Sequence, residues 1–237
     1  MQITYNNTTI NLLDNETKEV LLSLSGGCDS SSLFFLLCTH FPKLKIRPFN
    51  CLDIHHPFDT QCARDIYNWM KRRFPEQDIE PLEVNEFDDL DPNFHSEAEN
   101  YMKNNPNQFR TIRGVVKVRK MYQIHQSLLK KYPEAQLLFG QTKNPSFEDM
   151  KNYDHPALLN LREHRRDKVR HKVTYLEPFN TVDKKFIADI FKSHNLMDSL
   201  FTLTGSCVGT LELTDGFTKP CKECWWCHEK RWAFGTF

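Results

Sequence analysis

The sequence predicts an α/β protein with a doubly wound parallel sheet. Short apolar runs that end at glycine or at polar residues alternate with longer segments whose apolar side chains recur at helical spacing. The clearest run covers residues 19–24 and stops abruptly at Gly26 and Gly27. Such alternation indicates βαβ units, whose parallel strands present ligand sites at their carboxyl ends.

The individual elements follow from these two spacings. Residues 19–24 (EVLLSL) are short, apolar and stopped by glycine, which is typical of a buried parallel strand. Asp59 is expected to cap the helix after the second strand, and Asp183 is expected to cap the last long helix. The predicted strands cover residues 19–24, 45–52, 79–84 and 136–139, with an extended piece at 173–179, and the predicted helices cover 30–40, 59–70, 112–132 and 183–194.

Three further segments have a distinctive composition. The apolar face of the helix at 112–132 is expected to contain Val115, Val118, Tyr122, His125 and Leu129. Residues 76–99 carry ten acidic side chains and no Lys or Arg, which favours a solvated surface loop. Residues 162–172 carry six Lys or Arg and two acidic residues; they fit a solvated helix face or a basic cover that holds phosphate or carboxylate.

Composition sets the class of protein. The 237 residues are 39% hydrophobic and 26% charged, enough for a packed core, so wholesale disorder is excluded. Lys plus Arg and Asp plus Glu number 31 each, and this zero net charge argues against a general nucleic-acid-binding role. Neither a secretory signal nor an apolar run of membrane-spanning length is visible, so we expect a cytoplasmic protein with reduced thiols.

The segment Ser25-Gly26-Gly27-Cys28-Asp29-Ser30 joins a predicted strand to a predicted helix. Paired glycines let the backbone turn sharply and approach a ligand closely. Successive N–H groups and the amino end of the helix then favour an anion, and serine hydroxyls donate to phosphate oxygens. The Walker pattern and the dinucleotide fingerprint are both absent. The segment therefore indicates either a phosphate-binding loop of another kind or an ordinary glycine turn with Ser30 as a helix cap.

The string SGGCDSSSL after EVLLSL resembles the SGGxDS loop of the PP-loop (N-type) ATP pyrophosphatase superfamily, which has a Rossmann-like fold shared with adenine nucleotide alpha hydrolases. The resemblance implies that the loop binds the phosphates of ATP while a substrate oxygen attacks the α-phosphate and pyrophosphate leaves. It carries over Ser25, Gly26, Gly27, Asp29 and Ser30 as the pyrophosphate-binding set, and Cys28, which stands among them in the loop, is counted with the cofactor-binding residues. Asp29 is expected to bond loop amides or to help hold Mg²⁺.

Three more residues are candidates outside the loop. Asp53 ends the second predicted strand, where the superfamily places adenine and ribose, although capping a turn is the plain alternative. Lys184 occupies the place of a lysine that approaches the ATP phosphates in relatives, and a lysine in the first turn of a helix is otherwise disfavoured by the dipole. Lys143 follows the fourth strand as a further phosphate contact. Ser25, Asp29 and Lys184 are thus the predicted catalytic residues.

Four of the eight cysteines gather near the carboxyl end. Cys221, Cys224 and Cys227 follow a C-x-x-C-x-x-C spacing, with Cys207 upstream. Four thiolates complete the tetrahedral shell of Zn²⁺ and leave no open position, which indicates a structural zinc site; an iron–sulfur cluster is the rival. The other four cysteines are expected in the core or in loops. We expect an ATP-binding domain at 1–200 and a zinc-binding segment at 201–237 packed on it.

A second resemblance covers this carboxyl end. The cysteines, the following residues 228–234, and the segment 177–187 look like the corresponding parts of the 7-cyano-7-deazaguanine synthase family. The middle of the chain departs from that family. Tyr153 and Asp154 match a tyrosine and an aspartate near the family's substrate, but the Cys-Arg pair that follows these residues in the family is missing here. The fold and the use of ATP therefore transfer better than the substrate.

Together, the two resemblances imply an ATP-dependent ligase. It would adenylate a carboxylate, 7-carboxy-7-deazaguanine in that family, and use ammonia to form the nitrile, with ATP, Mg²⁺ and Zn²⁺ as cofactors. The alternatives are a PP-loop enzyme acting on another substrate, as in tRNA thiolation, and a non-catalytic nucleotide-binding module. No membrane partner is expected and a nucleic acid is disfavoured. The pair Trp225-Trp226 fits either a homodimer surface or packing on the main domain.

Overall fold

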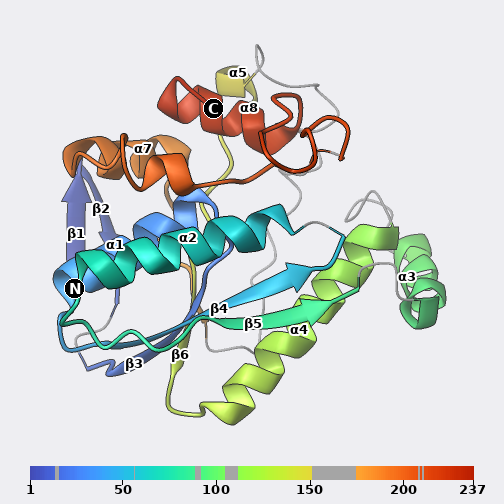
Figure 1. Cartoon of the computed structure of the whole chain (residues 1–237), viewed down its shortest axis with the longest axis horizontal. Helices are drawn as coiled ribbons and strands as arrows, with labels where there is room; N and C mark the ends of the chain where they lie inside the picture. Colours follow the sequence, from blue (N-terminus) through green and yellow to red (C-terminus); the bar gives the residue numbers. More distant parts are fainter. Residues whose placement is uncertain are drawn as a thin grey trace.

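The computed structural model describes residues 1–13, 16–55, 57–88, 92–104, 112–150, 175–207, 209 and 211–237. Its centre is a five-stranded sheet in the order β5-β4-β3-β6-β7, with every pair of neighbours parallel. Helices cover both faces of this sheet (Figure 1), which confirms the predicted fold class. The strands are β3 (Glu19–Ser23), β4 (Lys45–Asp53), β5 (Glu83–Phe87), β6 (Gln136–Phe139) and β7 (Tyr175–Leu176).

The strand order reverses direction next to β3. The chain runs outward from β3 to β4 and β5, and then returns to the other side of β3 for β6 and β7. In open parallel sheets, ligands bind in the crevice at such a switch point, beyond the carboxyl ends of the two strands. The glycine loop follows β3 directly, and Gly140 follows β6 directly. The topology therefore brings both glycine-containing turns to one place.

Alternating side chains of the central strand supply both cores. Val20 and Leu22 face the main core, whereas Leu21 on the same strand faces a smaller core with Leu128 and Leu137. The helices drawn in Figure 1 are α1 (Cys28–His40), α2 (Phe58–Arg73), α3 (Pro92–Asn104), α4 (Ile112–Lys131), α5 (Phe147–Met150), α7 (Lys184–Ser193) and α8 (Trp225–Phe234), with a 3₁₀ turn at Phe201–Leu203.

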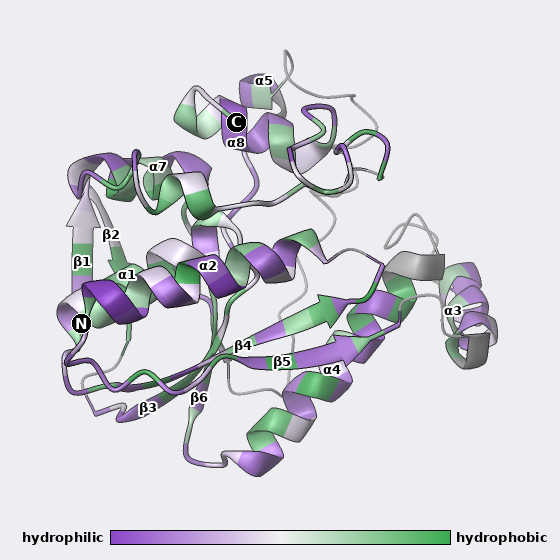
Figure 2. Ribbon diagram, viewed as in Figure 1, coloured by the Kyte–Doolittle hydropathy of each residue, from purple (hydrophilic) through white to green (hydrophobic). Residues whose placement is uncertain are grey.

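Helix α1 is buried on almost all sides. Ten of its 13 residues are buried, because the sheet lies below it and α2 and α7 both pack against it. Helices α2 and α4 are instead amphipathic: polar and apolar residues alternate along each of them in Figure 2. The apolar residues that α2 buries include Ala63, Ile66 and Met70, as the helical spacing predicts.

Several predicted boundaries and faces differ from the structure. Helix α1 begins two residues earlier than predicted, at Cys28, and α2 has Pro57 as its N-cap, which leaves Asp59 inside the first turn rather than at the cap. The strand predicted at 79–84 forms later, at Glu83–Phe87, because Ile79 makes only an isolated bridge to Ile46.

The longest helix also faces the core differently from the prediction. In α4, Val118 and Tyr122 are exposed, whereas Val115, Val116 and Leu128 are buried, since the helix contacts α3 at one end and the sheet at the other. The acidic stretch at 76–99, interpreted as a loop, contains β5 and most of α3 instead.

The structure also contains an amino-terminal hairpin that was not predicted from the sequence. Strands β1 (Gln2–Tyr5) and β2 (Thr8–Asn11) pair antiparallel around Asn6 and Asn7, whose φ angles are 46° and 62°. Asparagine tolerates this left-handed backbone, which two-residue hairpin turns require. The hairpin packs on α7, where the Tyr5 hydroxyl lies 2.6 Å from His194 Nε2.

The carboxyl-terminal segment shares the main core. Trp225, Trp232 and Phe234 of α8 belong to the same buried cluster as α1 and α7, and Trp226 packs partly against it. The Phe234 ring lies 5.5 Å from Phe191 and 4.6 Å from Phe201, between ring centroids. This packing fixes α8 on the α/β layer. Among the described residues, no helix combines the length and apolar character needed to cross a membrane.

Candidate functional site

The loop after β3 has the backbone that an anion site needs. Gly26 has a φ of +82°, and a Cβ atom there would lie 2.3 Å from the Asp59 carbonyl oxygen, so glycine is required on both grounds. Gly27 is the N-cap of α1, and no side chain caps it. The amides of the first helical turn, at Cys28, Asp29 and Ser30, are thus left to bind a ligand, and the helix dipole favours an anion there.

Serine side chains hold this loop in shape. The Ser30 hydroxyl lies 3.1 Å from the Ser25 hydroxyl, accepts from the Ser25 N–H at 3.2 Å and donates to the Gly27 carbonyl oxygen at 3.2 Å. Ser31 donates to the same carbonyl at 2.7 Å. Ser25 itself is exposed, which leaves its hydroxyl accessible. The loop is therefore ordered by its own residues before any ligand arrives, which lowers the entropic cost of binding.

A buried chain of charges adjoins the loop. Lys184 Nζ, at the start of α7, donates to Asp29 Oδ2 at 2.7 Å and lies 3.6 Å from Glu229 Oε2 on α8. The side chains of Lys184 and Glu229 are only 7% and 2% exposed. Thr142, after β6, donates to the same Asp29 oxygen at 3.3 Å. Three separate elements thus converge on the first turn of α1.

The chemistry of this chain follows from its burial. Burial by itself would lower the pKa of Lys184, but the Asp29 and Glu229 carboxylates raise it above its ordinary value, so the lysine stays protonated. Burial raises the pKa of Asp29, while the charge of Lys184 opposes that shift. Asp29 Oδ1 is buried and has no hydrogen-bond partner among the described residues. A cation with free coordination positions, such as Mg²⁺, fits an oxygen of this kind.

A second polar link runs parallel to the first. Lys230 Nζ donates to the Thr204 carbonyl oxygen at 2.9 Å and to its hydroxyl at 3.1 Å. The Thr204 hydroxyl lies 3.1 Å from Cys28 Sγ in the loop. The next residue, Gly205, donates its N–H to the Gly26 carbonyl oxygen at 2.9 Å. Residues 204 and 205 therefore connect the loop to α8.

A cluster of polar residues stands at the end of β4, beside the loop. Asp53 is buried, accepts from the His55 N–H at 3.0 Å and lies 4.0 Å from Lys117 of α4. Burial raises the pKa of Asp59 to about 7, although the nearby Lys117 opposes that shift. Asn50 donates to the Leu24 carbonyl oxygen at 2.7 Å and accepts from Thr60. These contacts tie the neighbouring strand end to the base of the loop.

The four carboxyl-terminal cysteines form one cluster. Their sulfurs all lie within 4.8 Å of one another, and those of Cys221 and Cys227 are 4.0 Å apart. A tetrahedron of sulfurs at about 2.3 Å from zinc has edges of about 3.8 Å, so the donor set fits that ion. Backbone N–H groups point at the sulfurs: those of Gly209 and Cys221 donate to Cys207, and that of Cys224 donates to Cys221. Such donors stabilise thiolate charge.

The remaining cysteines lie apart from this cluster. Cys28, Cys38 and Cys62 are buried and Cys51 is half-buried, all without a disulfide. Burial raises the pKa of both Cys51 and Cys62 to about 12, which keeps these thiols protonated. Their places in the core and loop agree with the sequence analysis.

The structure brings together most of the predicted site residues. Ser25 to Ser30 and Lys184 meet at the switch point, and Asp53 ends the adjacent strand. Lys143 is exposed, and its backbone N–H donates to Val182 at 2.7 Å. Tyr153, Asp154 and the basic run at 162–172 lie outside the described residues. Thr142, Glu229 and Lys230 could not be predicted from the sequence, because a single Thr, Glu or Lys carries no motif.

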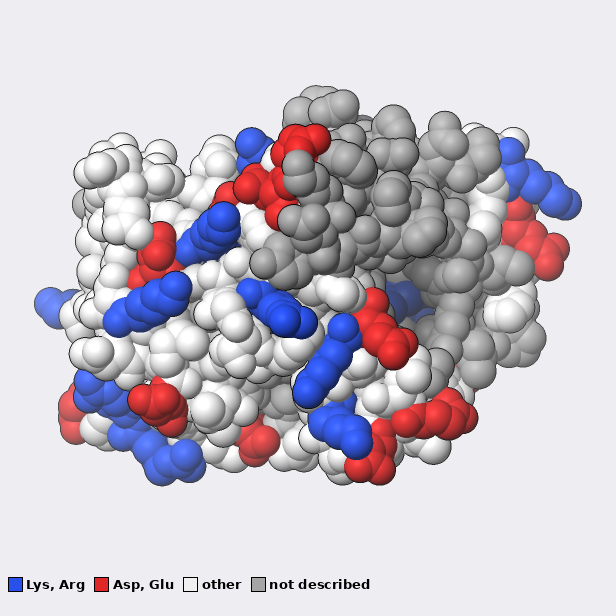
Figure 3. Space-filling view, turned by 90° about the horizontal axis from the view of Figure 1, so that it is seen from above, with Lys and Arg blue, Asp and Glu red and all other residues white. Residues whose placement is uncertain are grey.

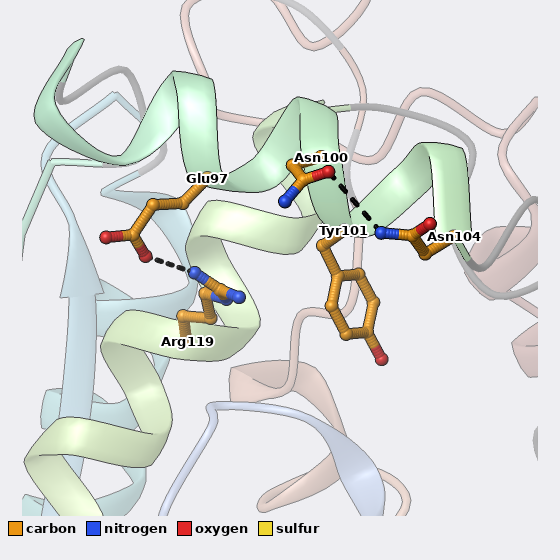
Figure 4. A pocket seen from close by; sticks show the side chains of 5 residues that line it. All are labelled: Glu97, Asn100, Tyr101, Asn104 and Arg119. Atoms are coloured by element: carbon orange, nitrogen blue, oxygen red, sulfur yellow. Dashed lines mark hydrogen bonds and ion pairs between the residues drawn. The ribbon is translucent and has the colours of Figure 1, made fainter.

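Two hollows lie on the described surface, one of them beside the residues that connect the glycine loop to α8. The larger, of about 520 Å³, is lined by residues of the 3₁₀ turn at Phe201–Leu203, of the segment around the four cysteines and of the start of α2, including Phe58, Thr204, Cys207 and Lys230. The smaller, of about 310 Å³, lies between α3 and α4, where Arg119 pairs with Glu97 and Asn104 donates to Asn100 at 3.4 Å (Figure 4). None of the predicted site residues lines this smaller hollow.

The surface is mixed in charge. On the face drawn in Figure 3, Lys and Arg alternate with Asp and Glu over the described residues, in agreement with the zero net charge. Within that view, the described residues form no broad basic surface of the kind that binds a nucleic-acid backbone.

Comparisons with known proteins find only distant similarities to solved structures. No family model and no curated protein matches the sequence. Among solved structures, a glutamine-dependent NAD⁺ synthetase from Acinetobacter baumannii, in complex with ADP, is 12% identical with a TM-score of 0.48; the match covers 84% of this chain and 34% of that chain. An NMN synthetase from Francisella tularensis is 13% identical with a TM-score of 0.45, over 93% of this chain and 78% of that chain.

A third solved structure is a 4-thiouridine synthetase in complex with RNA and bound ATP. It is 17% identical with a TM-score of 0.47, and the match covers 87% of this chain and 47% of that chain. The chain thus spans about a third of the first structure and about half of the third. Similarity this low carries no argument about fold or activity.

Proposed function

We propose that this chain is an ATP-dependent ligase that activates a carboxylate as its adenylate and releases pyrophosphate. The observation that carries the proposal is the glycine loop at the switch point, which ends at the uncapped amino end of α1 beside the Lys184–Asp29 pair. The resemblance of residues 19–33 to the PP-loop superfamily supports the same assignment.

The residues of the loop would act by binding and orientation. The first-turn amides of α1 and the Ser25 hydroxyl would bind the terminal phosphates, while Lys184, held protonated by its two carboxylates, would offset the charge that develops on pyrophosphate. Mg²⁺, when bound at Asp29 Oδ1, would supply further charge neutralisation. A carboxylate oxygen would then attack the α-phosphorus, the bond to the β-phosphate oxygen would break, and pyrophosphate would leave.

We infer that the co-substrate is 7-carboxy-7-deazaguanine, with ammonia as the second nucleophile. Ammonia would displace AMP from the acyl adenylate to give the amide. A second ATP would activate the amide oxygen in the same way, and loss of AMP and protons would leave the nitrile. The sum converts one carboxylate, one ammonia and two ATP into one nitrile, two AMP and two pyrophosphates, without any change of oxidation state. The C-x-x-C-x-x-C segment and the α8 residues after it support this choice.

The cysteine cluster would hold a structural zinc ion. Four cysteine ligands fill a tetrahedral shell, so the ion would take no part in the reaction; it would stabilise a segment that has little core of its own before α8.

The test is an isotope experiment with zinc-loaded protein. The substrate carries ¹⁸O in both carboxylate positions and is incubated with Mg-ATP and ammonium, and AMP, pyrophosphate and the nitrile are followed by mass spectrometry. We expect two AMP molecules per nitrile, each containing one ¹⁸O. If AMP forms only when another carboxylic acid is supplied, and no nitrile appears, that acid would be the substrate instead. If the protein binds ATP but turns over none of the substrates tested, the result would contradict an enzymatic function and favour a nucleotide-binding module.

A further inference from the structure

Two consecutive residues of α8 are each linked to the glycine loop through one intermediate residue. Glu229 Oε2 lies 3.6 Å from Lys184 Nζ, which in turn donates to Asp29 Oδ2 at 2.7 Å. Lys230 Nζ donates to the Thr204 carbonyl oxygen at 2.9 Å and to the Thr204 hydroxyl. The first link ends at Asp29 in the helical turn after the loop, and the second ends one residue earlier, at Cys28.

Helix α8 starts within the metal-binding cluster. Cys224 is its N-cap, and Cys227 is the third residue of the helix. Glu229 and Lys230 follow Cys227 by two and three positions, so they lie in the turn that the sulfur ligands fix. An ion bound by all four cysteines would therefore set the starting point and direction of the helix that presents both side chains.

Burial restricts the positions of the side chains in both links, the one through Lys184 and the one through Thr204. Glu229 and Lys230 are both buried. A buried charge that loses its partner is strongly destabilised, so neither side chain moves freely away from Lys184 or Thr204. The position of α8 and the position of the first turn of α1 are thus tied through polar contacts at two adjacent points. Gly205 adds a backbone contact to Gly26 on the same side.

We propose that α8 positions the glycine loop, with Glu229 and Lys230 as the positioning residues, so that metal on the four cysteines and nucleotide on the loop stabilise each other. The inference builds on the ATP site of the proposed function. Coupling of this kind is reciprocal: if the metal raises the affinity for ATP, ATP raises the affinity for the metal by the same factor.

The experiment measures the affinity for zinc instead of turnover. Zinc-loaded protein is mixed with the chromogenic chelator 4-(2-pyridylazo)resorcinol with and without saturating Mg-ATP, after the Kd for ATP has been measured by calorimetry. We expect the competition with the chelator at equilibrium to give a Kd for zinc that is about tenfold lower with ATP, within the usual range of coupling between two sites.

Two variants each weaken one of the two links. Glu229→Gln keeps the shape of the side chain but removes its charge from Lys184. Thr204→Val, three residues before the first cysteine of the cluster, removes the hydroxyl between Lys230 and Cys28. Each should keep one zinc per chain and lower the effect of ATP on the Kd for zinc to about threefold or less, as partial loss of the coupling requires. Glu229→Asp, which keeps the carboxylate, should restore part of the effect.

The matched control is Lys219→Gln, which removes an exposed lysine of the same segment that pairs with Asp215 at 3.2 Å and reaches neither link. It should keep the full effect of ATP. An equal Kd for zinc with and without ATP in a wild-type protein that binds ATP would overturn the inference and leave the proposed function intact, as would the full effect in both link variants. A wild-type protein that binds no ATP would overturn the proposed function and this inference with it.

Discussion

Gly140, directly after β6, lies so close to Asp29 in the first turn of α1 that a Cβ atom on Gly140 would sit 2.6 Å from the Asp29 carbonyl carbon. No side chain other than hydrogen fits without displacing the backbone of α1. The spacing of the two strand ends at the switch point therefore depends on this glycine, and it sets where the amides of the loop point.

Replacement of this glycine tests the relationship. In Gly140→Ala, the methyl group would push the first turn of α1 away from β6, so the Kd for ATP should rise about tenfold or more, the loss of about one good hydrogen bond to a charged group. Calorimetric titration measures it. Gly216→Ala is the control: its φ of +68° is strained with alanine, but its Cβ would contact nothing within 4 Å. That variant should lose stability and keep the affinity for ATP.

The serine pair of the loop allows a sharper comparison. Ser30→Ala removes the hydroxyl that contacts Ser25 and Gly27, so ATP should bind about five- to tenfold more weakly, in line with a net contribution of about 1 kcal/mol per hydrogen bond. Ser32→Ala is the matched control on the same helix, because its hydroxyl donates only to the Asp29 carbonyl oxygen, at 2.9 Å. Equal affinities of the two variants would contradict a role of Ser30 in the site.

Lys184 should matter for both stability and turnover. In Lys184→Met, two buried carboxylates lose their shared cation, which should cost about 3–5 kcal/mol in the free energy of unfolding at neutral pH. The rate of pyrophosphate release should fall about a hundredfold or more, the usual effect of losing one electrostatic group. Lys185→Met is the control, since the neighbouring lysine is exposed and lies over the Trp232 ring. Denaturant unfolding and a pyrophosphate assay measure the two effects.

Loss of one metal ligand should release the ion. Cys224→Ser should bind less than one tenth of the zinc of the wild-type protein by elemental analysis, and the near-ultraviolet signal of Trp225 and Trp232 should change as α8 loses its anchored start. Cys38→Ala, a buried cysteine outside the cluster, should keep one zinc per chain. Iron with labile sulfide in place of zinc would identify the rival cluster.

A pH dependence is expected from two neighbouring histidines, His40 at the end of α1 and His194 just after α7. Burial lowers the pKa of both His40 and His194 below the ordinary value of 6.5. The unfolded chain then binds more protons than the folded chain, so stability is complete above pH 6.5 and falls as the pH drops through that value. His40 Nε2 has no hydrogen-bond partner among the described residues. His40→Leu should therefore flatten the fall in unfolding temperature between pH 7 and pH 5, whereas an unchanged slope would assign it to other groups.

Much of the fold could be predicted because its signals are local. The strand at residues 136–139 was predicted to the residue, and the cap at Asp183 is confirmed by its hydrogen bond from the Lys185 N–H. Strand and cap depend on neighbours along the chain. The buried face of α4 could not be predicted, because whether Val118 or Val116 is covered depends on how α3 and the sheet approach the helix.

The candidate site divides in the same way. Residue order alone determined the glycine loop after a buried strand and the spacing of the four cysteines, since turns and ligand spacings are properties of a few adjacent residues. Only the tertiary structure decided that Lys184 meets Asp29, 155 positions away, and that Glu229 lies on the other side of the same lysine. It also decided that Gly140 leaves room for the first turn of α1. Those contacts arise because parallel strands bring distant segments to one edge of the sheet, and no local pattern in the chain encodes which side chains meet there.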